Sequence, residues 1–403
     1  MLRVLHMTES LPAAAGGTTA AFLGLMEALG TQREGLAFRA VSQKLDPADD
    51  TLRLIDPRDE RWVFTDPRGR FRAGGLARGA IEQIRTFNPH VVHVHGLWCP
   101  DVVAAALAAM DAGCKVVWQP HGMLVEAALN RSAWKKRLFL ALGLRTALAR
   151  ADAVLFTSTT EHDTSRLLML GPSTRPAIVP LPVKIEPPEA DLPRLHAEGR
   201  AKWNLGDVPV IVFVGRLHPV KRVHLSIAAL AEARTAHPGT KLLLVGDGEP
   251  AYANMLRQKA AKLGVADGLV FAGWLRGDDK YRALAAADAL VFNSEFENFG
   301  FAAVEAMLCH TPTVMTDNLS LARPSEAAGA GLVASSDPVQ IGSQLARLIT
   351  DPQRRVMGRR GRAWVEASFS AHAVGAQLAD LYESLAGIQP TASRPPTPLA
   401  AAT

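Results

Sequence analysis

Two glutamates, Glu297 and Glu305, are the residues of this 403-residue chain most clearly placed for chemistry. An apolar run at 289–292 precedes them and is typical of a buried strand. Residues 301–309 are apolar at every position except Glu305, as in a buried helix. The unit is therefore a strand, a tight turn at Gly300 and a helix. A buried carboxylate is costly unless it is partnered, and hydroxyl groups can partner it. The helix start offers free backbone N–H groups to an anion. A sugar nucleotide presents both hydroxyls and phosphates.

The residues around these glutamates resemble the E-x7-E motif of the family 4 retaining glycosyltransferases, the nucleotide-sugar-dependent group 1 enzymes with two Rossmann-like domains. The matching string is Glu297-Asn298-Phe299-Gly300 followed by Glu305. The resemblance implies that Glu297 belongs to the catalytic group and that Asn298, Phe299, Gly300 and Glu305 bind the donor nucleotide. A motif match is a hypothesis. The alternative is a core helix with one surface glutamate and a second glutamate in a loop.

A pair of basic residues follows the apolar strand predicted at 208–214. Arg216 lies at the strand end, and Lys221 lies at the start of the next predicted helix. A guanidinium and an ammonium together suit a diphosphate, although an exposed arginine and lysine without a ligand are the alternative. The string resembles the family's Gly-Arg-x-x-x-x-Lys motif, which implies that both residues stabilise the leaving group. In the family, backbone groups of the loop at Trp274 and Leu275 contact the base, so these two are assigned to nucleotide binding.

The N-terminal half offers a glycine loop. A strand at 2–7 leads to Gly16 and Gly17, and a helix is predicted from Thr18 to Leu29. Such a loop brings backbone N–H groups close to phosphate. It lacks the full G-x-G-x-x-G pattern, so a plain turn before a helix is the alternative. Family members carry a similar loop, which favours nucleotide binding by Gly16 and Gly17.

Two histidines in the same half follow the predicted strands. His95 and His121 lie at strand ends, where ligands of open parallel sheets bind. Lone histidines are more often structural. The string Pro120-His121-Gly122-Met123-Leu124 resembles polysaccharide-building members of the family. There the matching histidine approaches the transferred sugar, which makes His121 the stronger catalytic candidate of the two.

Strands and helices alternate along the chain, which predicts parallel α/β sheets. With the resemblance, the expected fold class is α/β: two doubly wound Rossmann-like domains facing across a cleft (GT-B), with a C-terminal helix crossing back to the first domain. Residues 45–72 are expected to be irregular. The expected divisions are an acceptor-binding domain at 1–183, a linker at 184–200, a nucleotide-sugar-binding domain at 201–369, a crossover helix at 370–387 and a disordered tail at 388–403.

Charge and composition indicate the kind of partner and the cellular location to expect. The net charge of +5 and the pI near 9.2 suit an anionic partner without naming it. A long helix expected at 130–150 carries six basic residues, no acidic one, and interleaved apolar residues such as Trp134 and Leu138. This pattern is typical of a membrane-surface helix, with an ordinary solvated face as the alternative. Three scattered cysteines and the lack of a secretory signal or a spanning apolar run predict a cytoplasmic protein, peripheral on the inner face of the plasma membrane if this helix binds lipid.

The predicted activity is transfer of a sugar from a nucleotide diphosphate sugar to a saccharide or lipid-linked saccharide, in cell-surface polysaccharide biosynthesis. Retention of configuration is implied by the resemblance. No metal is expected, because Arg216, Lys221 and helix-start amides could stabilise the leaving group and no Asp-x-Asp site is evident. No other cofactor and no nucleic acid is expected either. A sugar-nucleotide epimerase or hydrolase of the same fold, or a non-catalytic binding protein, stays open. The donor sugar, base, acceptor and oligomeric state are not fixed by the sequence.

Overall fold

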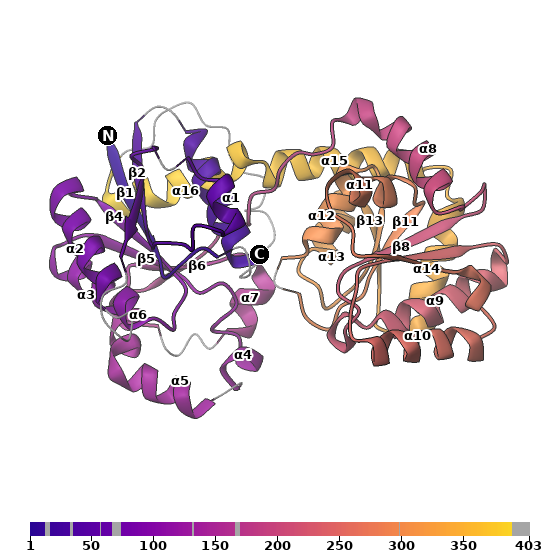
Figure 1. Cartoon of the computed structure of the whole chain (residues 1–403), viewed down its shortest axis with the longest axis horizontal. Coiled ribbons are helices and arrows are strands. Elements are labelled where there is room, and N and C mark those ends of the chain that lie inside the picture. The colour runs from indigo at the N-terminus through magenta and orange to yellow at the C-terminus, as the bar shows by residue number, and fades with distance from the viewer. Residues whose placement is uncertain are drawn as a thin grey trace. The chain divides into compact units, whose positions relative to one another are not determined.

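A computed structural model describes residues 1–12, 17–32, 35–56, 58–66, 74–130, 133–165, 170–297 and 299–388. The chain divides into two compact units. The first comprises Met1–Lys184 and the chain from Ser368 onward, and the second comprises Ile185–Ala367. Both are parallel α/β units (Figure 1), so the prediction of two Rossmann-like domains is confirmed. The cleft expected between them stays a prediction.

The first unit is built on a seven-stranded parallel sheet in the order β3-β2-β1-β4-β5-β6-β7. Its central strands are rich in β-branched residues and are buried on both faces, as in β4, whose five residues are all buried. The strands are β1 (Leu2–Thr8), β2 (Leu36–Gln43), β3 (Trp62–Thr65), β4 (Val91–His95), β5 (Lys115–Gln119), β6 (Ala153–Phe156) and β7 (Arg175–Ile178).

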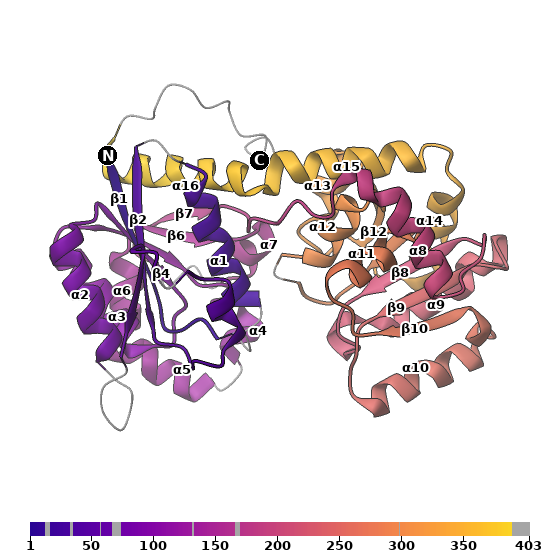
Figure 2. The same cartoon turned by 45° about the horizontal axis from the view of Figure 1, so that its top comes forward.

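Helices cover both faces of this sheet (Figures 1 and 2). One face packs against α2 (Gly75–Phe87), α3 (Pro100–Asp111) and α6 (Arg145–Arg150). The other packs against α1 (Gly17–Gly30) and the C-terminal helix α16 (Ala371–Ala386). The expected return of the last helix to the first domain is confirmed, because α16 packs along α1 (Figure 2). The short helices α4 (Glu126–Asn130), α5 (Ala133–Phe139) and α7 (Thr159–Thr164) complete this unit among the described residues.

The second unit has a six-stranded parallel sheet in the order β10-β9-β8-β11-β12-β13. Its strands are β8 (Val210–Val214), β9 (Lys241–Val245), β10 (Leu269–Gly273), β11 (Ala289–Phe292), β12 (Thr313–Thr316) and β13 (Gly331–Ala334). Its helices are α8 (Leu192–Lys202), α9 (Val223–Ala236), α10 (Pro250–Lys262), α11 (Gly277–Ala285), α12 (Phe301–Leu308), α13 (Ala322–Ala327), α14 (Pro338–Thr350) and α15 (Arg354–Phe369). The core of one sheet face is filled by α9, α10 and α14.

The structure differs from the expected linker at 184–200. Most of this segment is helix α8, which packs on α11 as part of the second unit. A Cβ on Gly199 would lie 2.3 Å from the Arg282 carbonyl oxygen, so glycine permits the close approach. The Arg282 Nε donates to Glu198 at 2.6 Å across the same contact. The prolines that suggested a linker precede the helix or occupy its first turn, where proline is tolerated.

Two further segments differ from expectation. Residues 45–72 are not wholly irregular, since Trp62–Thr65 forms the edge strand β3, paired with β2. The long helix expected at 130–150 is interrupted, because Gly143 has φ 128°, outside the helical region. The helical stretch therefore divides into α5, a turn at Leu140–Leu144 and α6. Among the described residues, no helix combines the length and apolar character needed to cross a membrane.

The contact between α1 and α16 predicts the effect of one substitution. A Cβ on Gly375 of α16 would lie 2.2 Å from the Ala28 carbonyl oxygen of α1. We expect Gly375→Ala to lower the free energy of unfolding by about 1–3 kcal/mol, because the helices must separate to admit the methyl group. Thermal and urea unfolding measure the change. The control is Gly30→Ala, whose Cβ would meet only an arginine side-chain nitrogen at 3.6 Å. Equal stability of the two variants would contradict this account of the packing.

Candidate active site

The carboxyl ends of β8, β9 and β10 bring three loops of the second unit into backbone contact. The Gly215 N–H donates to Val245 O at 2.9 Å, and the Gly246 N–H donates to Gly273 O at 2.8 Å. A Cβ on Gly246 would lie 2.0 Å from Gly215 O, so this close stacking requires glycine. Ligands of open parallel sheets bind beyond this edge, which makes these loops the floor of the candidate site.

Lys221 and Glu297 meet at this edge. Lys221 ends a short 3₁₀ turn, Pro219–Lys221, and its Nζ donates to Glu297 Oε2. The two side chains are 18% and 22% exposed, so the pair is shielded from bulk water yet open to a ligand. A backbone bond from Glu295 N–H to Val220 O, 2.8 Å, holds the two loops together. The structure therefore joins two of the residues that the sequence predicts to be catalytic.

Glu305 is also paired with a lysine. Its Oε1 accepts a hydrogen bond from Lys280 Nζ at 2.6 Å, and both side chains are 24% exposed. Glu305 lies on α12 and Lys280 on α11. The Lys280 ammonium supplies the partner that a carboxylate in this apolar helix requires. Among the described residues Oε2 has no hydrogen-bond partner, so one oxygen stays available to a ligand.

The start of α12 is fixed by two predicted residues. Gly300 caps the helix with φ 100°, a left-handed conformation that favours glycine. Phe299 is 4% exposed and packs edge-to-face on Phe301 with ring centroids 4.9 Å apart. The Phe299 side chain therefore anchors the turn at the start of α12. Asn298 lies outside the described residues.

Other predicted residues of the second unit lie on neighbouring loops. Arg216 is exposed one residue beyond Gly215, and the structure gives it no bond to Lys221 or Glu297 within the described residues. Trp274, 54% exposed, and Leu275, half-buried, lie in the loop between β10 and α11. This loop and the Arg216 loop border the same sheet edge, where parallel strands end.

His121 belongs to the first unit and lies just after β5. Its backbone is left-handed, with φ 50°, and its Nε2 is 3.1 Å from His95 Nδ1. The buried Glu161 holds the turn by accepting from the Gly122 N–H and from the Thr157 N–H. Burial lowers the pKa of His121 to about 4, so its ring is neutral at pH 7. Gly17 begins α1, and Gly16 lies outside the described residues.

Sequence reasoning missed three residues that support these sites. Lys280 gave no signal, because a lysine in an amphipathic helix is ordinary. Glu161 follows Ser158 as a helix-start pattern, but its bond to Gly122 depends on the tertiary fold. His6 gave a weak signal, since it lies on a strand that ends beside the one carrying His95.

Comparison with known proteins extends over both units. Residues 16–182 match the model of the glycosyl transferase 4-like domain, and residues 197–364 match the model of the glycosyl transferases group 1. The D-inositol 3-phosphate glycosyltransferase of Segniliparus rotundus is 34% identical over 194 residues, 46% of this chain and 43% of that protein. This match therefore spans less than half of that relative.

Two other likenesses cover nearly the whole chain. The GDP-mannose-dependent alpha-(1-6)-phosphatidylinositol monomannoside mannosyltransferase of Mycobacterium tuberculosis is 26% identical over 399 residues, 94% of this chain and 98% of that protein. The structure of HepE from Anabaena in complex with UDP superposes with a TM-score of 0.72 and 19% identity, over 95% of this chain and 100% of that one. The fold is that of the two-domain glycosyltransferases. With a group 1 model on the second unit and a 4-like model on the first, the chain belongs to the group 1 glycosyltransferases.

Proposed function

We propose that this protein transfers a sugar, with retention of configuration, from a nucleotide diphosphate sugar to a saccharide or lipid-linked saccharide in cell-surface polysaccharide assembly. The observation that carries the proposal is the Lys221–Glu297 pair at the carboxyl edge of the second sheet. It places an ammonium, which could bind phosphate, beside a carboxylate, which could bind a sugar hydroxyl. Similarity to a GDP-mannose-dependent enzyme makes GDP-mannose the first donor to test.

The ammonium of Lys221 has three N–H donors, of which the Glu297 contact uses one. The remaining donors are available to a phosphate oxygen without loss of the ion pair. As the bond from sugar to phosphate breaks, negative charge grows on the leaving diphosphate. Lys221 and the exposed Arg216 would interact more strongly with the diphosphate in the transition state than in the ground state. This difference would lower the activation barrier without a metal. Glu297 would accept a hydrogen bond from a hydroxyl of the sugar.

The nucleotide would lie along α12. Glu305 Oε2 would accept from the ribose hydroxyls while Oε1 keeps its bond to Lys280. Backbone N–H groups near Phe299 and Gly300 would meet phosphate, and the Trp274–Leu275 loop would contact the base. On the first unit, the neutral His121 would contact the transferred sugar, and backbone at Gly17 would contribute to phosphate binding.

Exposed apolar and basic side chains between Trp134 and Leu142 support the proposal of a lipid-linked acceptor. Trp134, Leu138 and Leu142 are 68%, 55% and 75% exposed and follow one another at four-residue spacing. Exposed basic residues lie among them, and Lys135 Nζ lies 5.5 Å from the Trp134 ring centroid. An apolar stripe flanked by basic side chains suits an anionic membrane surface. We propose that α5 and the following turn hold the enzyme on the inner leaflet, beside a lipid-linked acceptor.

The role of Glu305 predicts a binding defect. Glu305→Gln removes the charge shared by Lys280 and the ribose, so we expect GDP and UDP to bind more weakly by about 1–3 kcal/mol. Isothermal titration measures the affinity. Glu326→Gln is the control, because Glu326 lies on α13 and its ion pair with Arg323, 2.9 Å, is exposed. Unchanged affinity in Glu305→Gln would refute the ribose assignment.

The role of Lys221 predicts a rate defect. We expect Lys221→Ala to lower kcat at saturating donor, because its charge acts most strongly on the departing diphosphate. Initial rates with GDP-mannose and a panel of UDP- and ADP-sugars, with and without a lipid acceptor, provide the measurement. Lys262→Ala on α10 is the control. Normal kcat with a raised KM would contradict the leaving-group role. Turnover without any acceptor would indicate a hydrolase or epimerase, and binding without turnover a non-catalytic protein.

The membrane proposal is tested by co-sedimentation with anionic vesicles. We expect salt-sensitive binding of the wild type, since each basic residue near such a surface contributes about 1 kcal/mol. Lys135→Ala/Arg137→Ala should weaken the electrostatic part, and Leu138→Ser/Leu142→Ser should weaken binding that survives high salt. The control, Arg355→Ala/Arg359→Ala, removes the same charge from α15 and should bind like the wild type. If all variants bind equally, α5 is an ordinary solvated helix.

A further inference from the structure

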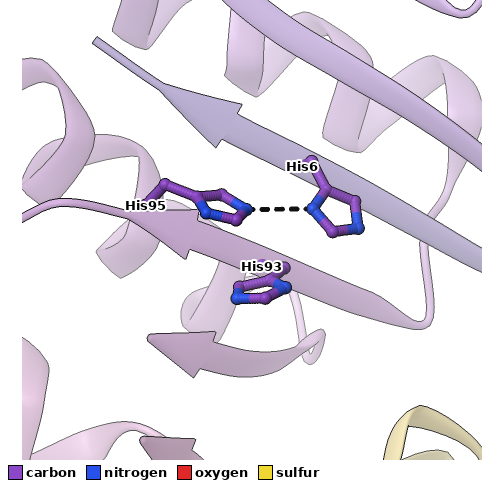
Figure 3. A group of neighbouring side chains, drawn as sticks. All are labelled: His6, His93 and His95. Carbon is purple, nitrogen blue, oxygen red and sulfur yellow. Dashed lines mark hydrogen bonds between the residues drawn. The ribbon is translucent and has the colours of Figure 1, made fainter. Parts of the chain in front are cut away.

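Five side chains of the first unit form one hydrogen-bonded chain that ends at His121. His121 Nε2 lies 3.1 Å from His95 Nδ1. His95 Nε2 in turn lies 3.0 Å from His6 Nδ1 (Figure 3). The Tyr382 hydroxyl lies 3.5 Å from His6 Nε2 and 2.6 Å from His93 Nδ1. These contacts therefore lead from the end of β5, along one face of the sheet, to the C-terminal helix.

The sheet register creates this cluster. His6 of β1 is paired with His93 of β4, and Thr8 is paired with His95. Residues two apart on a strand share a face, so His6, His93 and His95 lie on the face covered by α1 and α16. The α16 helix brings Tyr382, which is fully buried. The Phe22 ring from α1 packs against the His95 ring with centroids 4.6 Å apart.

These rings are neutral. Burial lowers the pKa of His6 to about 3, and burial with neighbouring histidines lowers the pKa values of His93 and His95 well below their usual range. The hydrogen-bond partners described for the three rings are other imidazoles and Tyr382, and none is a carboxylate. A neutral imidazole has one N–H and one lone pair. In such a chain each ring must donate on one side and accept on the other, so one tautomer determines the rest.

The direction of the chain is decided at its inner end. Tyr382 has one hydrogen for two nitrogens. If it donates to His93 Nδ1, His93 carries its proton on Nε2, which is buried without a partner among the described residues. If instead His93 Nδ1–H donates to the Tyr382 oxygen, His93 Nε2 carries a lone pair, and only this lone pair lacks a partner among the described residues. A buried N–H without an acceptor is the rarer defect. Tyr382 then donates to His6, His6 to His95, and His95 to His121 Nε2, which leaves the His121 proton on Nδ1.

We propose that His93, Tyr382, His6 and His95 are positioning residues that hold His121 neutral with its proton on Nδ1, as a fixed hydrogen-bond donor to an oxygen of the transferred sugar. The proposal rests on the proposed function for the contact with sugar, but the tautomer itself does not. Among the described residues Nδ1 has no partner, so this N–H is the free end of the chain.

The same cluster has the composition of a metal site, since ligand atoms of His6, His93 and His95 lie within 4.8 Å of one another. Two facts favour the hydrogen-bonded chain. A divalent ion would add two positive charges to a buried site at a large desolvation cost, and no carboxylate of the described residues is hydrogen-bonded to these rings to offset it. Binding through His6 Nδ1 and His95 Nε2 would also break the bond between them and release the tautomer of His95.

Nitrogen NMR of the full chain labelled with ¹⁵N-histidine tests the proposal, because the two tautomers give opposite patterns of Nδ1 and Nε2 shifts. We expect wild-type His121 in the Nδ1–H form near pH 7. In Tyr382→Phe the donor to His6 is lost, so His121 should shift toward the Nε2–H form that free neutral imidazole prefers. Tyr252→Phe in the second unit is the matched control and should leave His121 unchanged. A wild-type Nε2–H form, or no change in Tyr382→Phe, would overturn the proposal.

A second variant guards against misfolding of the first. His95→Asn keeps an amide near the Nδ1 position but removes the link to His6, and this amide can donate or accept. His121 should then become a tautomer mixture while keeping a hydrogen bond. Kinetically, both variants should lower kcat a few-fold with little change in donor KM. If stoichiometric Zn²⁺ shifts the His6, His93 and His95 signals, these histidines form a metal site and the proposed hydrogen-bonded chain is wrong. The predicted tautomers without turnover on any sugar would instead refute only the proposed function.

Discussion

The cost of placing a carboxylate in apolar surroundings governs the second unit. The helix α12 packs against α11 and against strands β11 and β12 with residues that are nearly all apolar, yet it carries Glu305. Lys280 from α11 offsets that cost, and Lys221 does the same for Glu297 in the preceding turn. Each lysine brings a charge from another segment to a carboxylate that the local sequence leaves unpartnered. One ion pair thereby joins the β11–α12 turn to the loop after β8, and the other joins α12 to α11.

The first unit also buries polar side chains, but these side chains carry no charge. Histidines and a tyrosine are buried on one apolar face of its sheet, and burial keeps the imidazole rings neutral. Neutral rings can satisfy one another only as donor and acceptor in turn, so geometry determines protonation. Under the proposed function, the charged residues at the carboxyl edge of the second sheet would bind the diphosphate, and the neutral His121 ring of the first unit would bind an oxygen of the sugar. Such a division matches a reaction in which charge develops on the leaving group.

Close backbone contacts position both sets of residues. In the second unit the loops after β8 and β9 approach so closely that a side chain on Gly246 or Gly248 would meet a carbonyl oxygen at 2.0 Å. In the first unit Gly375 lets α16 approach α1, which places Tyr382 over the sheet. Glycine thus supports the candidate sites by setting how closely the backbones of neighbouring elements approach.

The sequence by itself determined the features that are local. Apolar runs alternating with helical patterns fixed the two parallel sheets, and the string from Glu297 to Glu305 fixed a strand, turn and helix, since backbone propensity and burial act over a few neighbours. The tertiary structure decided the partners. Lys280 lies 25 residues from Glu305, and Tyr382 lies 289 residues from His93. Neither pairing leaves a periodic pattern in the chain, because each depends on how two helices pack. Two further outcomes depended on packing in the same way. The segment 184–200, predicted to be a linker, contains a helix docked on α11, and Gly143 interrupts the helix predicted at 130–150.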